Sequence, residues 1–99
     1  MQDTTTKPRV QLQVERPKLH KVILVNDDFT PREFVTMVLK AEFRLGEEKA
    51  RQVMMTAHQR GVCVVAVFTK EVAEEKATNA TDAGRKKSYP LLFTTEPEE

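Results

Sequence analysis

The sequence predicts an α+β fold: a single small β-α-α-β-α-β domain, whose three-stranded, mainly antiparallel sheet carries three helices packed on one face. The chain has 99 residues, which is enough for one hydrophobic core and too few for two. Three short apolar runs have the length of strands, and three longer stretches repeat apolar residues with the helical period. With 39% apolar and 31% charged residues, the composition is typical of a globular domain.

The two ends of the chain differ in composition from its middle. Residues 1–17 are polar, contain Pro8 and Pro17, and show no helical period, so we expect a flexible N-terminal arm. Residues 18–95 hold the apolar runs and form the expected core domain. Residues 96–99 are acidic apart from one proline and are expected to form a frayed tail.

The first strand is predicted over residues 19–25, and a strong helix-start signal follows it. Thr30 is a candidate N-cap, and Glu33 three residues later completes a capping box. Phe29 before the cap and Phe34 after it match a hydrophobic staple. We therefore expect a rigid turn that leads into a helix ending near residue 43.

The second helix is predicted to begin near residue 46 and to end at residue 60. Gly61 then suits the left-handed conformation that often terminates a helix. The expected inner face of this helix repeats at i, i+3, i+4, i+7 and i+8 and comprises Ala50, Val53, Met54, Ala57 and His58.

The rest of the chain predicts a strand, a helix and a final strand. Residues 62–69 are rich in β-branched side chains and too few for a stable helix, so they predict a buried strand. Thr69 is a candidate cap for a third helix, which fades near Gly84. Pro90 ends the following loop, and residues 91–95 predict the last strand.

Charge and cysteine content exclude several classes of protein. The formal net charge is +1 and the longest basic run has three residues, so we expect no nucleic-acid partner. Cys63 is the only cysteine; it lies in an apolar run and predicts a buried, inert thiol and a reducing, cytoplasmic environment. No apolar stretch reaches membrane-spanning length, so no membrane association is expected.

Polar side chains gather where the first strand is predicted to end. Asn26, Asp27 and Asp28 follow that strand directly. Because consecutive helices joined by a short loop pack antiparallel, the end of the second helix should approach this turn. His58 is therefore expected close to Asn26, Asp27 and Thr30.

These groups are hydrogen-bond acceptors, and no lysine or arginine lies between residues 22 and 31. A compact cation with three donors suits them, and a protein α-ammonium group, with a reference pKa of about 7.7–8.0, is such a cation. An apolar lining is expected beside them from Val35, Met54, Ala57 and Leu91. Taken singly, each of these four is typical of a core position.

Two other functions use the same residues. Asp27, Asp28 and His58 are chemically able to bind a divalent metal or to act as acid and base. Adjacent carboxylates diverge in an extended segment, however, and the sequence offers neither a second nearby histidine nor a nucleophile. A small α/β interaction domain is the other alternative, but it leaves the polar turn and His58 without a role.

Four blocks of the chain resemble the ClpS family, bacterial adaptors that deliver N-degron substrates to a AAA+ unfoldase-protease. They are residues 21–31 (KVILVNDDFTP), 54–58 (MMTAH), 67–74 (VFTKEVAE) and 90–94 (PLLFT). The blocks occur in the family's order, have spacing similar to that of the family, and span about residues 18–95. Together they are far more specific than any one block.

The resemblance implies a non-enzymatic adaptor, monomeric and without cofactor or metal, that binds N-terminal Leu, Phe, Tyr or Trp of substrate proteins. By this resemblance, Asn26, Asp27 and His58 hold the substrate's α-amino group. The implied side-chain pocket comprises Asp28, Thr30, Arg32, Val35, Met54, Ala57 and Leu91. Glu71 and Lys76 match positions that contact the N-terminal domain of a ClpA-type unfoldase, and the N-terminal arm matches a segment used in substrate transfer.

Two positions depart from the family pattern. Arg32 stands where a methionine commonly restricts the pocket against β-branched side chains. Ala57 replaces a larger aliphatic residue and is expected to widen the pocket. Together with a polar third helix and a short arm, these departures resemble a second-paralogue type.

Overall fold

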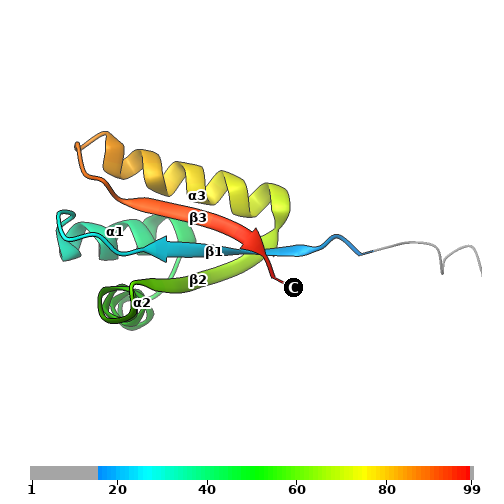
Figure 1. Ribbon diagram of the computed structural model, residues 1–99, viewed down its shortest axis with the longest axis horizontal. Coiled ribbons are helices and arrows are strands. Elements are labelled where there is room, and N and C mark those ends of the chain that lie inside the picture. The colour runs from blue at the N-terminus through cyan, green and yellow to red at the C-terminus, as the bar shows by residue number, and fades with distance from the viewer. Residues whose placement is uncertain (1–15, 99) are drawn as a thin grey trace, which may run out of the picture.

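A computed structural model describes residues 16–98 and confirms the predicted order of elements (Figure 1). The elements are β1 (Leu19–Val25), α1 (Arg32–Phe43), α2 (Glu47–Arg60), β2 (Val62–Thr69), α3 (Lys70–Arg85) and β3 (Leu92–Pro97). The arm expected over residues 1–17 lies almost wholly outside the described residues.

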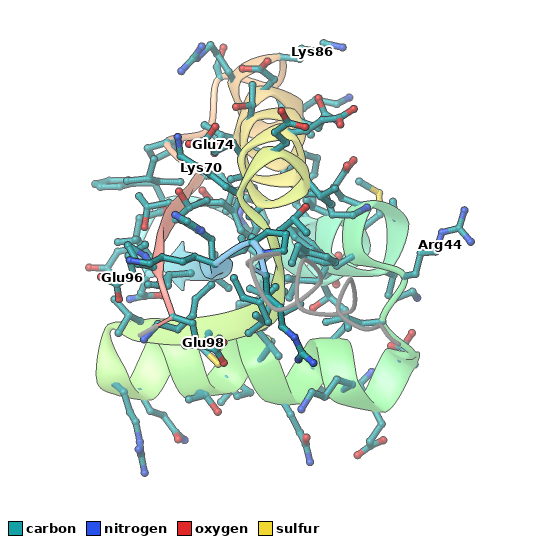
Figure 2. All side chains as sticks on the ribbon, turned by 90° about the vertical axis from the view of Figure 1, so that its right-hand side faces the viewer. Arg44, Lys70, Glu74, Lys86, Glu96 and Glu98 are labelled. Carbon is teal, nitrogen blue, oxygen red and sulfur yellow. The ribbon has the colours of Figure 1, made fainter. Side chains whose placement is uncertain are left out.

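The three strands form one antiparallel sheet, as predicted, and their order in the sheet is β2-β1-β3. Leu24 in the central strand pairs with Cys63 on one side and with Phe93 on the other. Val22, Leu24 and Phe93 are buried, and the helices cover this face. Figure 2 shows Glu96 on β3 and Arg44 at the end of α1 pointing to opposite sides of the molecule. The helices thus lie on one face of the sheet.

Each helix contributes a buried stripe to the core. The stripe of α3 is made of small residues, which allow its backbone to lie close to the sheet. In the part of the chain that the structure describes, no helix has the length and apolar character needed to cross a membrane. The buried helical residues are Val35, Val38, Leu39 and Phe43 of α1, Ala50, Val53 and Ala57 of α2, and Ala73, Ala77, Ala80 and Gly84 of α3.

Thr81 on α3 satisfies the backbone of the edge strand β3. Its hydroxyl accepts a hydrogen bond from the Phe93 backbone N–H at 2.9 Å and donates to the Phe93 carbonyl at 3.4 Å. One side chain therefore occupies both groups with which Phe93 would otherwise bind another strand. Covering a sheet edge in this way opposes pairing with other chains.

The capping box predicted at Thr30 is wrong. The helix begins at Arg32, Pro31 is the cap residue, and no side chain bonds the free N–H groups there. The Thr30 hydroxyl donates instead to Asp27 Oδ2 at 2.9 Å, because the Asp27 carboxylate folds back over the turn. The hydrophobic staple is also wrong: Phe29 is 79% exposed, and Phe34 packs edge-on against Tyr89 with the ring centroids 5.0 Å apart.

The last strand is longer than predicted and includes part of the segment assigned to an acidic tail. It begins at Leu92 and runs to Pro97. The Lys21 ammonium lies 3.7 Å from the Glu96 carboxylate, and the Glu98 N–H donates to the Leu19 carbonyl at 2.9 Å. These contacts with β1 hold residues that their composition alone marks as frayed.

We expect Thr81→Val to lower the free energy of unfolding by about 1–3 kcal/mol. Valine has nearly the same shape but leaves the Phe93 N–H without its partner, and an unsatisfied buried donor costs about that much. Urea denaturation followed by circular dichroism measures the change. Thr78→Val, at an exposed position of the same helix, is the matched control and should change stability by less than about 0.5 kcal/mol. Equal effects of the two substitutions would contradict the role given to Thr81.

Candidate functional site

A hollow of about 130 Å³ opens at the end of β1, between the start of α1 and the second half of α2. All ten residues that the sequence assigned to amino-group binding or to the pocket line it. An engineered cavity that holds benzene has about 150 Å³, so the hollow is near the size needed for one ring or one branched side chain. The lining comprises Asn26, Asp27, Asp28, Thr30, Arg32, Val35, Met54, Ala57, His58 and Leu91, together with Leu24 and Val25.

Two lining residues, Leu24 and Val25, were missed from the sequence. Both belong to β1, and they were assigned from the sequence to this strand without being placed in the site. Their position directly before Asn26 was the available signal, because the residues that end a strand remain close to the turn that follows. Leu24 is almost fully buried and Val25 is partly exposed.

The turn after β1 is held by the Asp27 carboxylate. Asp27 Oδ1 accepts hydrogen bonds from the backbone N–H groups of Phe29 at 2.8 Å and Thr30 at 2.7 Å. Asp27 Oδ2 accepts from the Thr30 hydroxyl. A carboxylate offers about four acceptor positions, so about one of them is left after these three bonds. Asp27 is therefore mainly the residue that shapes the turn.

A backbone hydrogen bond joins this turn to the end of α2. The Asn26 N–H donates to the Gly61 carbonyl at 2.9 Å, and the Gly61 N–H donates to the Ala57 carbonyl at 2.7 Å. Gly61 has a φ of 95°, which residues with a side chain rarely adopt, so the predicted glycine terminator is confirmed. His58 is thereby held beside the turn, as the antiparallel packing of the helices predicted.

The structure places a cation, the Arg32 guanidinium, against the polar part of the site, whereas Arg32 was assigned from the sequence to the side-chain pocket. An Arg32 guanidinium nitrogen lies 2.8 Å from His58 Nε2. Arg32 follows the turn in sequence, just beyond the segment without lysine or arginine, and its long side chain returns across the hollow. The site therefore contains acceptors with one positive side chain already among them.

The apolar wall of the hollow is largely buried. Val35, Ala57 and Leu91 are 8%, 1% and 3% exposed, and Met54 is half-buried. Leu91 lies against Gly84 of α3, where an added Cβ would be 2.7 Å from Leu91 Cβ. Glycine at position 84 thus allows Leu91 to lie where it lines the hollow.

The two residues assigned to an unfoldase lie apart from the hollow. Glu71 is exposed in the first turn of α3. Lys76 is half-buried; its ammonium donates to the Glu42 carbonyl at 2.9 Å and lies 5.7 Å from the centroid of the Phe68 ring. Lys76 therefore already has a structural role in joining α3 to α1.

The geometry gives little support to metal or nucleophilic chemistry. Among residues 16–98, no three His, Cys, Asp or Glu side chains are grouped closely enough to hold a metal ion. Cys63 is half-buried on β2, and burial raises the pKa of its thiol above the ordinary value, which keeps the reactive thiolate scarce at neutral pH.

Comparison with known proteins gives concordant matches. The family model described as ATP-dependent Clp protease adaptor protein ClpS matches residues 15–94. The chain is 72% identical to ClpS 1 of Bradyrhizobium diazoefficiens and 71% identical to ClpS 2 of Mesorhizobium japonicum, in both cases over all of both chains. It is also similar to the solved structure of Agrobacterium tumefaciens ClpS2 bound to L-phenylalaninamide, with a TM-score of 0.83 and 61% identity over 84% of this chain and all of that one.

We expect Gly84→Ala to lower the free energy of unfolding by roughly 1–3 kcal/mol, because the new methyl group overlaps Leu91 and forces it to move. In most helices this substitution has the opposite sign, since alanine is the better helix former. Urea denaturation measures the change. Gly46→Ala is the control, because nothing lies within 4 Å of the added Cβ; loss of a glycine cap there should cost less, up to about 1 kcal/mol. A gain in stability for Gly84→Ala would show that Leu91 is not held by this contact.

Proposed function

The chain belongs to the ClpS family of Clp protease adaptors, which are not enzymes, and from that premise we propose that its hollow binds the free N-terminal residue of a substrate protein. The side chain of that residue is bulky and apolar: Leu, Phe, Tyr or Trp. The adaptor then delivers the substrate to a ClpA-type unfoldase in the cytoplasm. The observation that carries the proposal is that an acceptor-rich turn borders an apolar hollow, which is large enough for one side chain.

The polar part of the hollow suits an α-ammonium group. Such a group is mostly charged at neutral pH and has three donors. Asn26 and Asp28 line the hollow, and Asp27 has about one acceptor position left after shaping the turn. His58 Nε2 is a further acceptor once Arg32 leaves it. The N-terminal end of α1 is electropositive, so the two carboxylates are needed to make this place attractive to a cation.

The apolar part of the hollow suits a large hydrocarbon side chain. Val35, Met54, Ala57 and Leu91 supply its wall, and burial of a Leu or Phe side chain contributes about 1.5–3 kcal/mol. L-phenylalaninamide, the ligand of the Agrobacterium protein, has a free amino group, an aromatic side chain and no carboxylate. It is thus a chemical equivalent of the first residue of a chain, which supports the same ligand class here.

The unfoldase contact is proposed at the start of α3. Glu71 is exposed there and lines a surface hollow with Lys18 and His20 at the beginning of β1. The candidate site lies beyond the other end of β1. Figure 1 shows that α3 starts beside the beginning of β1. A strand of seven residues spans roughly 20 Å, so the two surfaces are well separated. An adaptor with this layout can hold substrate and unfoldase at the same time. Lys76 contributes less directly, because its ammonium is bonded to Glu42.

A peptide that begins with Phe should bind at least tenfold more tightly than the same peptide with an acetylated N-terminus. Acetylation removes the charge and two donors, and each hydrogen bond involving a charged group contributes about 1.5–3 kcal/mol. Fluorescence anisotropy of the two labelled peptides measures the difference. A peptide that begins with Gly but is otherwise identical is the control for the side chain and should also bind weakly. Equal affinity of the free and acetylated peptides would rule out ammonium recognition.

The His58→Ala variant should bind the Phe peptide roughly fivefold to twentyfold more weakly, since one acceptor of the ammonium is lost. Because His58 is exposed, the free energy of unfolding should change by less than about 0.5 kcal/mol. His20→Ala is the matched control: His20 is the other histidine of the chain, it lies at the far end of β1, and its loss should leave affinity within twofold of wild type. Unchanged affinity in His58→Ala would contradict the assignment.

A further inference from the structure

Arg32 determines which nitrogen of His58 carries the proton. The guanidinium group has only donors and stays protonated in proteins, so the 2.8 Å contact makes His58 Nε2 the acceptor. A neutral imidazole then carries its hydrogen on Nδ1. The contact therefore specifies the tautomer of His58.

This contact leaves His58 without a free acceptor. A neutral imidazole has one ring nitrogen with an available lone pair, and Arg32 occupies it. An α-ammonium group also has only donors, so it needs that same lone pair. The guanidinium and a ligand's ammonium group cannot both be bonded to His58 at once.

The fold gives no other reason for the position of the Arg32 side chain. Arg32 is the first residue of α1, where the positive end of the helix disfavours a cation. Lys40 and Arg51, the basic residues nearby on α1 and α2, both pair with Glu47. Between described residues no such ion pair includes Arg32, and its guanidinium contacts His58 instead.

Arg32 also has somewhere to move. Both Arg32 and Met54 line the candidate site and, in addition, a second hollow between the exposed faces of α1 and α2, beside Thr36 and Met37. The guanidinium thus stands between two open spaces. The second hollow gives the guanidinium a place to go when it leaves His58.

We propose that Arg32 is an internal competitor of the ligand: its guanidinium occupies His58 Nε2 in the free protein, and the α-ammonium group of the substrate must displace it. The identity of the displacing group, an α-ammonium group, rests on the function proposed above. Because only the fraction of molecules with a free His58 accepts the ligand, the apparent Kd of every ligand rises by one common factor. Arg32 therefore raises the ligand concentration needed for binding, while the ratios of affinity between ligands stay the same.

The first test uses the protein without ligand. Long-range ¹H–¹⁵N NMR spectra of histidine-labelled protein should show the His58 hydrogen on Nδ1 in wild type and a shift towards Nε2–H in Arg32→Met. His20 in the same spectra is the internal control and should not change. A wild-type His58 with its hydrogen on Nε2 would overturn the proposal, whether or not the protein binds peptide.

The second test measures affinity for peptides that begin with Phe and with Leu. Arg32→Met should bind both roughly threefold to tenfold more tightly than wild type, the effect of removing one exposed hydrogen-bond competitor. Arg60→Met removes the same charge from an exposed position two residues from His58 and should leave affinity within twofold.

The outcomes separate this inference from the function on which it rests. Equal or weaker binding by Arg32→Met overturns the competitor role while leaving N-terminal recognition intact. Binding of neither peptide by either protein overturns both, since there is then no ammonium ligand for Arg32 to oppose.

Discussion

The hydrogen bond from the Asn26 backbone to the Gly61 carbonyl is the contact on which the site depends. It joins the end of the central strand to the end of α2, and β2 begins at the very next residue, with Val62 paired to Val25. Gly61 makes this possible, because its φ of 95° turns the chain sharply from helix into strand. The conformation of Gly61 and its hydrogen bond with Asn26 therefore end α2, start β2 beside β1, and hold His58 close to the turn.

Charge then decides what the site accepts. The electropositive end of α1 favours anions, whereas the carboxylates of Asp27 and Asp28 favour cations. The Asp27 carboxylate accepts three hydrogen bonds within the turn. It therefore fixes the conformation of the turn and also contributes a negative charge to the site. Arg32 adds a cation of the protein's own, whose guanidinium contacts His58 Nε2. In the competitor role proposed above, the ammonium group of a ligand displaces it. Such a site suits a ligand that has both an ammonium group and a side chain large enough to fill the hollow.

Regular features of the structure followed from the sequence, and features that depend on one side chain's direction did not. Hydrophobic period and glycine placement predicted all six elements and placed His58 beside the turn. Residue types alone misassigned Thr30, because the helix begins one residue later than a Thr30 cap requires and the Thr30 hydroxyl donates to the Asp27 carboxylate. The return of Arg32 to His58 has no periodic signal, since a long side chain at a helix start has several directions open to it. The pairing of Glu96 with Lys21 likewise became visible only with the strand register.

We propose that the turn after β1, the end of α2 and Leu91 form one binding site for an N-terminal residue. Titration of ¹⁵N-labelled protein with L-phenylalaninamide, followed by amide chemical shifts, is the test of this site. We expect saturable shifts concentrated at residues 24–32, at residues 54–61 and at Leu91, with little change at the start of α3. Shifts centred on the groove between α3 and β3, or no saturable shift at all, would contradict it.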